Sequence, residues 1–87
     1  MVADHEQVSR LVKNARGQLD SVLRMIDEDR YCMDVANQLL ASQALIRKAT
    51  REVLRAHMSA CVTDAVAAGD AARQLDELVD IFDKMTR

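Results

Sequence analysis

The length, composition and charge of the chain exclude several classes of protein. It has 87 residues, 49% of them apolar, with one Tyr, one Phe, no Trp and a net charge of −2. A chain of this length forms one small domain, residues 1–87, which buries only about 60% of its unfolded surface and gains stability from oligomerisation. The scarcity of aromatic residues excludes a platform for stacking single-stranded bases. Because the chain has no signal peptide and no apolar run of roughly 18 residues, we expect a soluble, cytoplasmic protein with no membrane partner.

The apolar residues of the N-terminal third predict a helix over residues 4–28. They recur every three or four positions, which is the period of one buried helical face. These residues are Val8, Leu11, Val12, Ala15, Leu19, Val22, Leu23 and Ile26. Gly17 lies within this helix at a cost of about 1 kcal/mol relative to Ala, which indicates close packing or the approach of a partner.

The next helix is predicted to be long. Residues 31–68 contain no proline and no glycine, so we expect one uninterrupted helix of about 35 residues. Gly69 is its expected C-cap, and Asp70 is the expected N-cap of a third, amphipathic helix over residues 71–85. The apolar stripe of the long helix exceeds what a solvent-facing helix needs, which indicates burial against another helix in a dimer. The fold class is therefore all-α, a three-helix protomer with a long second helix.

Three residues of the long helix stand out as potential metal ligands. His57 and Cys61 are four residues apart, so they share one face a single turn from each other. Cys32 lies 25 residues before His57, which returns it to within about 20° of that face but about 37 Å away along the axis. One straight helix cannot bring all three residues onto one atom.

A second copy of the chain, running antiparallel, removes this difficulty. Cys32 of one chain then meets His57 and Cys61 of the other, the two-fold axis lies near residues 45 and 46, and each dimer holds two Cys/His/Cys sites. Thiolates select Cu(I), Zn(II) or iron–sulfur clusters, and closed zinc sites require a fourth ligand. Three donors therefore suit Cu(I) best, although Met33 and Met58 flank the set and offer thioether sulfur. Two cysteines in an intracellular protein also point to metal or redox chemistry rather than a structural disulfide.

The plainer alternative is that both cysteines are small buried hydrophobes and that His57 is an ordinary core histidine. The convergence of three residues on one face, at spacings that a dimer closes, weighs against it. No Ser/His/Asp set, glycine-rich phosphate loop or carboxylate pair is present, so we expect no enzyme and no small-molecule substrate.

A local concentration of basic residues is hidden in the total charge. Between Val35 and Thr63, four basic residues stand against Glu52 alone, whereas six acids follow from Asp64 onward. Around the two-fold axis the basic residues of two chains would merge into a stripe that can follow a phosphate backbone. A solvated helix face is the alternative. The candidate DNA contacts on the first two helices are Arg10, Lys13, Arg16, Arg47, Lys48, Arg51 and Arg55.

These motifs resemble the CsoR-type bacterial transcriptional repressors, which include copper, nickel/cobalt, formaldehyde and persulfide sensors. The resemblance covers nearly the whole chain and includes the Arg16-Gly17-Gln18 sequence, Tyr31-Cys32 and the His57-x3-Cys61 pair. The spacing Cys-x24-His-x3-Cys is that of the copper-sensing branch. That branch also has a Tyr and a Glu around the ligating His, and Tyr31 and Glu77 match their places.

The resemblance implies an all-α homodimer that pairs into a homotetramer and binds operator DNA when it is free of metal. Cu(I) binding to Cys32, His57 and Cys61 would lower DNA affinity and derepress copper-resistance genes. By linkage, DNA would then weaken Cu(I) binding by the same factor.

Two other sensor branches fit the motifs less well or only in part. The nickel/cobalt branch is disfavoured because His5 is out of register with that branch's N-terminal His, and because Cys61 stands where that branch has His. A persulfide sensor, in which a sulfur bridge links Cys32 to Cys61 of the partner, requires no His and is the main rival. A metal-binding helical oligomer that never touches DNA is a further alternative, and it leaves the basic stripe without a use.

Overall fold

The computed structural model describes residues 1–86, except for the side chains of residues 61, 62 and 65. All regular structure among the described residues is helical, which confirms the predicted all-α class. The chain divides into two compact units, one formed by Asp4–Thr50 and the other by Met1–Ala3 together with the chain from Arg51 onward.

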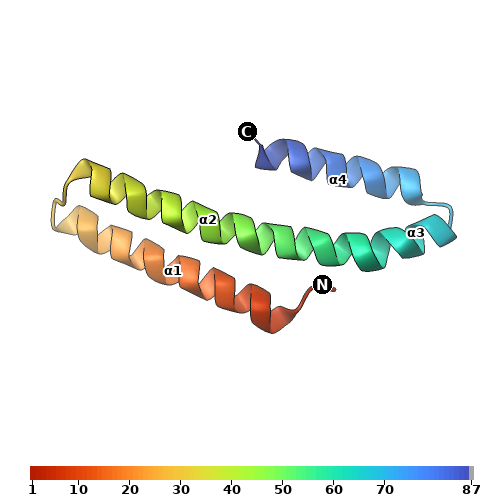
Figure 1. Cartoon of the computed structure of the whole chain (residues 1–87), viewed down its shortest axis with the longest axis horizontal. Helices are drawn as coiled ribbons and strands as arrows, with labels where there is room; N and C mark the ends of the chain where they lie inside the picture. The colour runs from red at the N-terminus through yellow and green to blue at the C-terminus, as the bar shows by residue number, and fades with distance from the viewer. Residues whose placement is uncertain (87) are drawn as a thin grey trace. The chain divides into compact units, whose positions relative to one another are not determined.

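The first unit is a helical hairpin formed by α1 (His5–Asp27) and the N-terminal part of α2 (Cys32–His57) (Figure 1). Asp4 caps α1, because its Oδ1 accepts hydrogen bonds from the backbone N–H groups of Glu6 at 3.0 Å and Gln7 at 3.3 Å. The predicted helix over residues 4–28 is thus confirmed to within one residue at each end.

A Schellman motif ends α1 and reverses the chain. The N–H of Asp29 donates to the carbonyl of Ile26 at 3.0 Å, and the N–H of Arg30 donates to that of Met25 at 2.9 Å. Asp29 adopts a left-handed φ of 53°, which aspartate tolerates better than most residues. The turn therefore follows from local backbone chemistry.

Between the two helices of this unit, small side chains and one polar contact fill the interior. Leu11, Ala15, Val22 and Ala49 are buried, and Ser42 is only 1% exposed. The Ser42 hydroxyl makes a hydrogen bond to Gln38 O at 3.1 Å and to Gln18 Oε1 at 3.4 Å. Since Gln18 belongs to α1, this contact ties the two helices together.

The single chain buries only part of the apolar stripe predicted for α1. Val12, Leu23 and Ile26 are each more than half exposed, and Leu19 is 40% exposed. The part of α2 in this unit also has exposed apolar residues, among them Leu39 and Ile46. Gly17 shows no close packing either, because a Cβ built there would meet no atom within 4 Å. One chain offers too little neighbouring surface to cover these faces.

The second unit contains the largest departure from the prediction. The long helix is not one α-helix: α2 ends at His57, a π-helical turn η1 (Met58–Val62) follows, and α3 (Thr63–Ala67) resumes the α-helix. In a π-turn the backbone hydrogen bonds run to the fifth residue rather than the fourth, so one extra residue is inserted in the coil. The chain stays helical but loses its regular register here.

The last helix lies where the sequence predicts it. Gly69 adopts a left-handed φ of 77°, as expected for a C-cap, and α4 spans Ala71–Met85. Asp70 stands at the N-cap position, but its side chain makes no capping hydrogen bond and instead binds the Arg73 guanidinium. The predicted Asp70 cap is therefore wrong in its side-chain role. Figure 1 shows α4, in blue, turning back alongside the helical segment that precedes it.

The interior of the second unit is small. Leu54 and Leu78 are buried, and so is Ala3 of the N-terminal segment. Other apolar residues of α4 remain exposed, with Leu75 at 53%, Val79 at 58% and Phe82 at 43%. Within the described part of the chain, no helix combines the length and hydropathy that crossing a bilayer requires.

Candidate metal and DNA sites

His57 is held by a side chain from another helix of its own unit. It is the last residue of α2 and is half-buried. Its Nε2 lies 3.0 Å from Oε1 of Gln74, which belongs to the first turns of α4. A hydrogen bond of this length between two half-buried groups fixes the orientation of the imidazole ring.

A cavity of about 460 Å³ brings His57 together with Glu77. Its walls are mainly aliphatic, so the imidazole and the carboxylate lie in a largely apolar pocket, whose wall also includes the N-terminal residue Met1. The aliphatic and N-terminal lining residues are Met1, Val2, Val53, Leu54, Leu78 and Ile81. The structure thus places Glu77 in the pocket of the residue that it was expected to accompany.

The π-turn falls between the two residues of the His57-x3-Cys61 pair. Because η1 begins directly after His57 and contains Cys61, the α-helical relation of i and i+4 does not hold for them. The π-turn changes the angle between residues four apart but keeps them about one turn from each other, so the shared face of His57 and Cys61 stays a prediction. The Cys61 side chain lies outside the described part of the structure.

The other two predicted metal-site residues belong to the first unit. Cys32 is the first residue of α2, and it is a free, exposed cysteine. Tyr31 precedes it and is 69% exposed, and its carbonyl accepts hydrogen bonds from the N–H groups of Asp34 and Val35 at 3.0 and 3.2 Å. Among the described residues, no group of three or more His, Cys, Asp or Glu side chains is placed to hold a metal ion.

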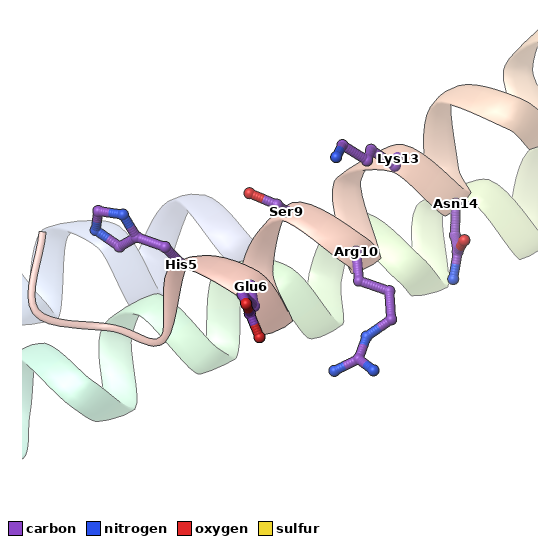
Figure 2. A pocket seen from close by; sticks show the side chains of 6 residues that line it. All are labelled: His5, Glu6, Ser9, Arg10, Lys13 and Asn14. Atoms are coloured by element: carbon purple, nitrogen blue, oxygen red, sulfur yellow. The ribbon is translucent and has the colours of Figure 1, made fainter.

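All seven predicted DNA-contacting residues are exposed. Arg10 and Lys13 line an open hollow of about 500 Å³ on α1, and Figure 2 shows their side chains extending to different sides of the helix. His5, Glu6, Ser9 and Asn14 complete the lining of this hollow. On α2, Arg55 differs from the others in that its guanidinium binds Glu52 at 2.8 Å.

Two polar partners between helices were not predicted from the sequence. Gln74 lies three residues before Glu77, so the two share a face of α4. Because Glu77 was expected beside His57, this spacing was the one sequence signal that pointed to Gln74. Gln18 stood out only as part of a motif, whereas in the structure it accepts a hydrogen bond from the buried Ser42.

Comparison with known proteins agrees with this arrangement. Residues 4–84 match the family described as metal-sensitive transcriptional repressor. The chain belongs to this family. The resemblance drawn from its motifs is thereby confirmed.

Among curated relatives, this repressor is 33% identical over 84 residues to the copper-sensing transcriptional repressor CsoR of Bacillus subtilis (strain 168), a match that covers 97% of this chain and 83% of that one. It is 42% identical over 69 residues to the CsoR of Mycobacterium ulcerans (strain Agy99), which covers 79% of this chain and 59% of the relative.

Solved structures of other repressors share its fold. The copper-sensing repressor CsoR with Cu(I) from Geobacillus thermodenitrificans NG80-2 superposes with a TM-score of 0.86 at 30% identity, covering 94% of this repressor and 85% of that chain. The nickel-responsive transcriptional regulator InrS superposes with a TM-score of 0.79 at 26% identity, covering 98% and 96%.

Proposed function

We propose that this repressor responds to Cu(I): the metal-free protein binds operator DNA, and Cu(I) releases it to derepress copper-resistance genes. The curated relatives named above are copper-sensing repressors, and one solved neighbour carries Cu(I). The donor set agrees, because two thiolates and one imidazole suit a soft, three-coordinate ion.

The proposed site is formed by Cys32 of one chain with His57 and Cys61 of a second, antiparallel chain. Cys32 and His57 are the first and last residues of α2, and a helix of that length separates its ends by about 37 Å. A second chain resolves this separation. The exposed apolar residues of α1 and α2 supply a surface that a dimer, and then a tetramer, would bury.

The observation that carries the proposal is the shared pocket of His57 and Glu77. A carboxylate beside a ligating imidazole orients the ring and raises its basicity towards the metal. Since Glu77 belongs to α4, a metal bound at His57 would affect the position of this helix. Tyr31, directly before Cys32, is proposed as the second residue beside the ligands.

DNA binding is assigned to the seven exposed basic residues, chiefly as phosphate contacts. Their interaction with a phosphate backbone should fall steeply with salt. If Cu(I) lowers DNA affinity, DNA lowers Cu(I) affinity by the same factor, which supplies an internal check on any measured coupling.

The test is an anaerobic Cu(I) titration of the reduced protein against a competing chelator, repeated on His57→Ala and on His5→Ala as the matched control. We expect one tight Cu(I) per chain, strong weakening in His57→Ala and none in His5→Ala. Adding Cu(I) to the DNA complex should release the DNA. Weak or non-stoichiometric binding that ignores His57 would rule out the copper assignment.

A persulfide sensor is the second candidate, and one observation favours it. Cys32 is exposed and free, so its thiolate can attack the outer sulfur of a low-molecular-weight persulfide, which displaces a thiolate and leaves a persulfide on Cys32. Attack on that persulfide by Cys61 of the partner would form the bridge and release hydrosulfide. In that case sulfur bridging of Cys32 to Cys61 of the partner would release DNA, and His57→Ala would leave the response intact. The copper proposal predicts the opposite behaviour of this variant.

A further inference from the structure

Gln74 contacts one of the two ring nitrogens of His57. Its Oε1 lies 3.0 Å from Nε2 of the imidazole, and both residues are half-buried. Gln74 and Glu77 stand three residues apart on α4, so both lie on one face of this helix, and Glu77 lines the same cavity as His57. The hydrogen bond, however, is made by the amide of Gln74.

The chemistry of this contact sets the tautomer of the imidazole. An amide oxygen only accepts, so the ring nitrogen facing it must carry the proton. A neutral imidazole protonated at Nε2 has a bare lone pair at Nδ1. Nδ1 is then the ring nitrogen whose lone pair is available to a ligand.

We propose that Gln74 is a positioning residue that holds His57 in the Nε2–H tautomer and so presents Nδ1 to the metal. This inference rests on the proposed function for the identity of the metal, but the tautomer itself is a property of the metal-free chain. An amide oxygen suits this role because it accepts a hydrogen bond and cannot donate one. Glu77 remains in the pocket as the charged companion.

Replacing Gln74 separates this role from packing. Gln74→Leu keeps the approximate size and removes the acceptor, whereas Gln74→Glu keeps an acceptor oxygen at the same place. The same exchange at another half-buried glutamine, Gln7→Leu on α1, is the matched control for the added leucine. Far-ultraviolet circular dichroism of each variant checks that the helices are intact.

The first measurement is the ¹⁵N chemical shifts of the imidazole nitrogens in the metal-free, reduced protein under conditions where imidazole is neutral. The chain has two histidines, and His5→Asn assigns their signals. We expect the Nε2–H tautomer of His57 in the parent, Gln74→Glu and Gln7→Leu proteins, and a mixture of tautomers in Gln74→Leu. An unchanged Nε2–H tautomer in a folded Gln74→Leu protein would overturn the proposal, as would Nδ1–H in the parent.

The second measurement is Cu(I) affinity by chelator competition. Loss of a partner to a ligating histidine typically weakens metal binding 10- to 100-fold, so we expect about a tenfold loss in Gln74→Leu and little change in Gln74→Glu and Gln7→Leu. Equal affinities in all four proteins would overturn the positioning role. If the parent bound no Cu(I), the proposed function would fail, while the ¹⁵N shifts would still decide whether Gln74 sets the tautomer.

Discussion

At the scale of single residues, Ser42 shows how a polar side chain is accommodated between α1 and α2. It is 1% exposed, and its hydroxyl bonds Gln38 O and the Gln18 side chain. Ser42→Ala should lower the free energy of unfolding by about 1 kcal/mol, because it removes hydrogen bonds but fits the space. Ser42→Leu should lower it by about 2 kcal/mol through overpacking.

Urea unfolding followed by circular dichroism measures both changes, with the exposed Ser59→Ala as a control that should change the free energy of unfolding by no more than about 0.5 kcal/mol. A Ser42→Leu protein as stable as Ser42→Ala would show that the space around Ser42 is not filled.

The two arginines at the C-terminal end of α2 should differ in their contribution to DNA binding. Arg55 is bound to Glu52 at 2.8 Å, which offsets part of its charge, whereas Arg51 is exposed one turn earlier. We therefore expect Arg51→Ala to weaken DNA binding more than Arg55→Ala, and Glu52→Gln to strengthen it. The slope of log affinity against log salt should become shallower by about 0.9 for each DNA phosphate that the variant no longer neutralises.

Fluorescence anisotropy of labelled duplex DNA at several salt concentrations measures these slopes. Equal effects of the two arginine substitutions would contradict a role for Glu52 in modulating the basic stripe.

At the scale of elements, replacing the two glycines by alanine should change the stability of the protein in opposite directions. Gly69 has a φ of 77°, so Gly69→Ala should destabilise the protein by about 1 kcal/mol through left-handed strain. Gly17 lies in α1 with no atom within 4 Å of an added Cβ, so Gly17→Ala should stabilise it by about 1 kcal/mol.

Thermal unfolding of the pair, each against the parent chain at one protein concentration, tests this contrast. A destabilising Gly17→Ala would indicate that another chain packs against this position, since nothing in the single chain does.

The limits of α1 and α4 could be predicted closely, because Asp4, Gly69 and the apolar spacing carry the signals that start and end helices. The π-turn could not. Residues 58–62 are ordinary helix formers without Pro or Gly, so their backbone register is not set by local propensity. Likewise, the partner of His57 depends on how α4 packs, and a spacing of three between Gln74 and Glu77 does not reveal which of them makes the hydrogen bond.

At the scale of the whole molecule, the apolar pattern predicts more buried residues than the single chain covers, and their burial against a second chain stays a prediction. Leu23, Ile26 and Val79 are each more than half exposed in the single chain. The same reasoning applies to the proposed metal site: residue types and spacing predict Cys32, His57 and Cys61 as ligands, whereas the proposed assembly requires a second chain. Sequence periodicity describes one helix face and carries no direct record of its partner.

The central claim is that each copper site draws ligands from two chains, and a mixed dimer tests it most directly. Neither Cys32→Ala nor His57→Ala alone should bind Cu(I) tightly. When the two variants are unfolded together and refolded as a mixture, the heterodimer should regain one intact site, formed by Cys32 of the His57→Ala chain with His57 and Cys61 of the Cys32→Ala chain. Isolated with two different affinity tags and titrated anaerobically, it should bind one tight Cu(I) per two chains. No tight binding by the heterodimer would contradict a site shared between chains.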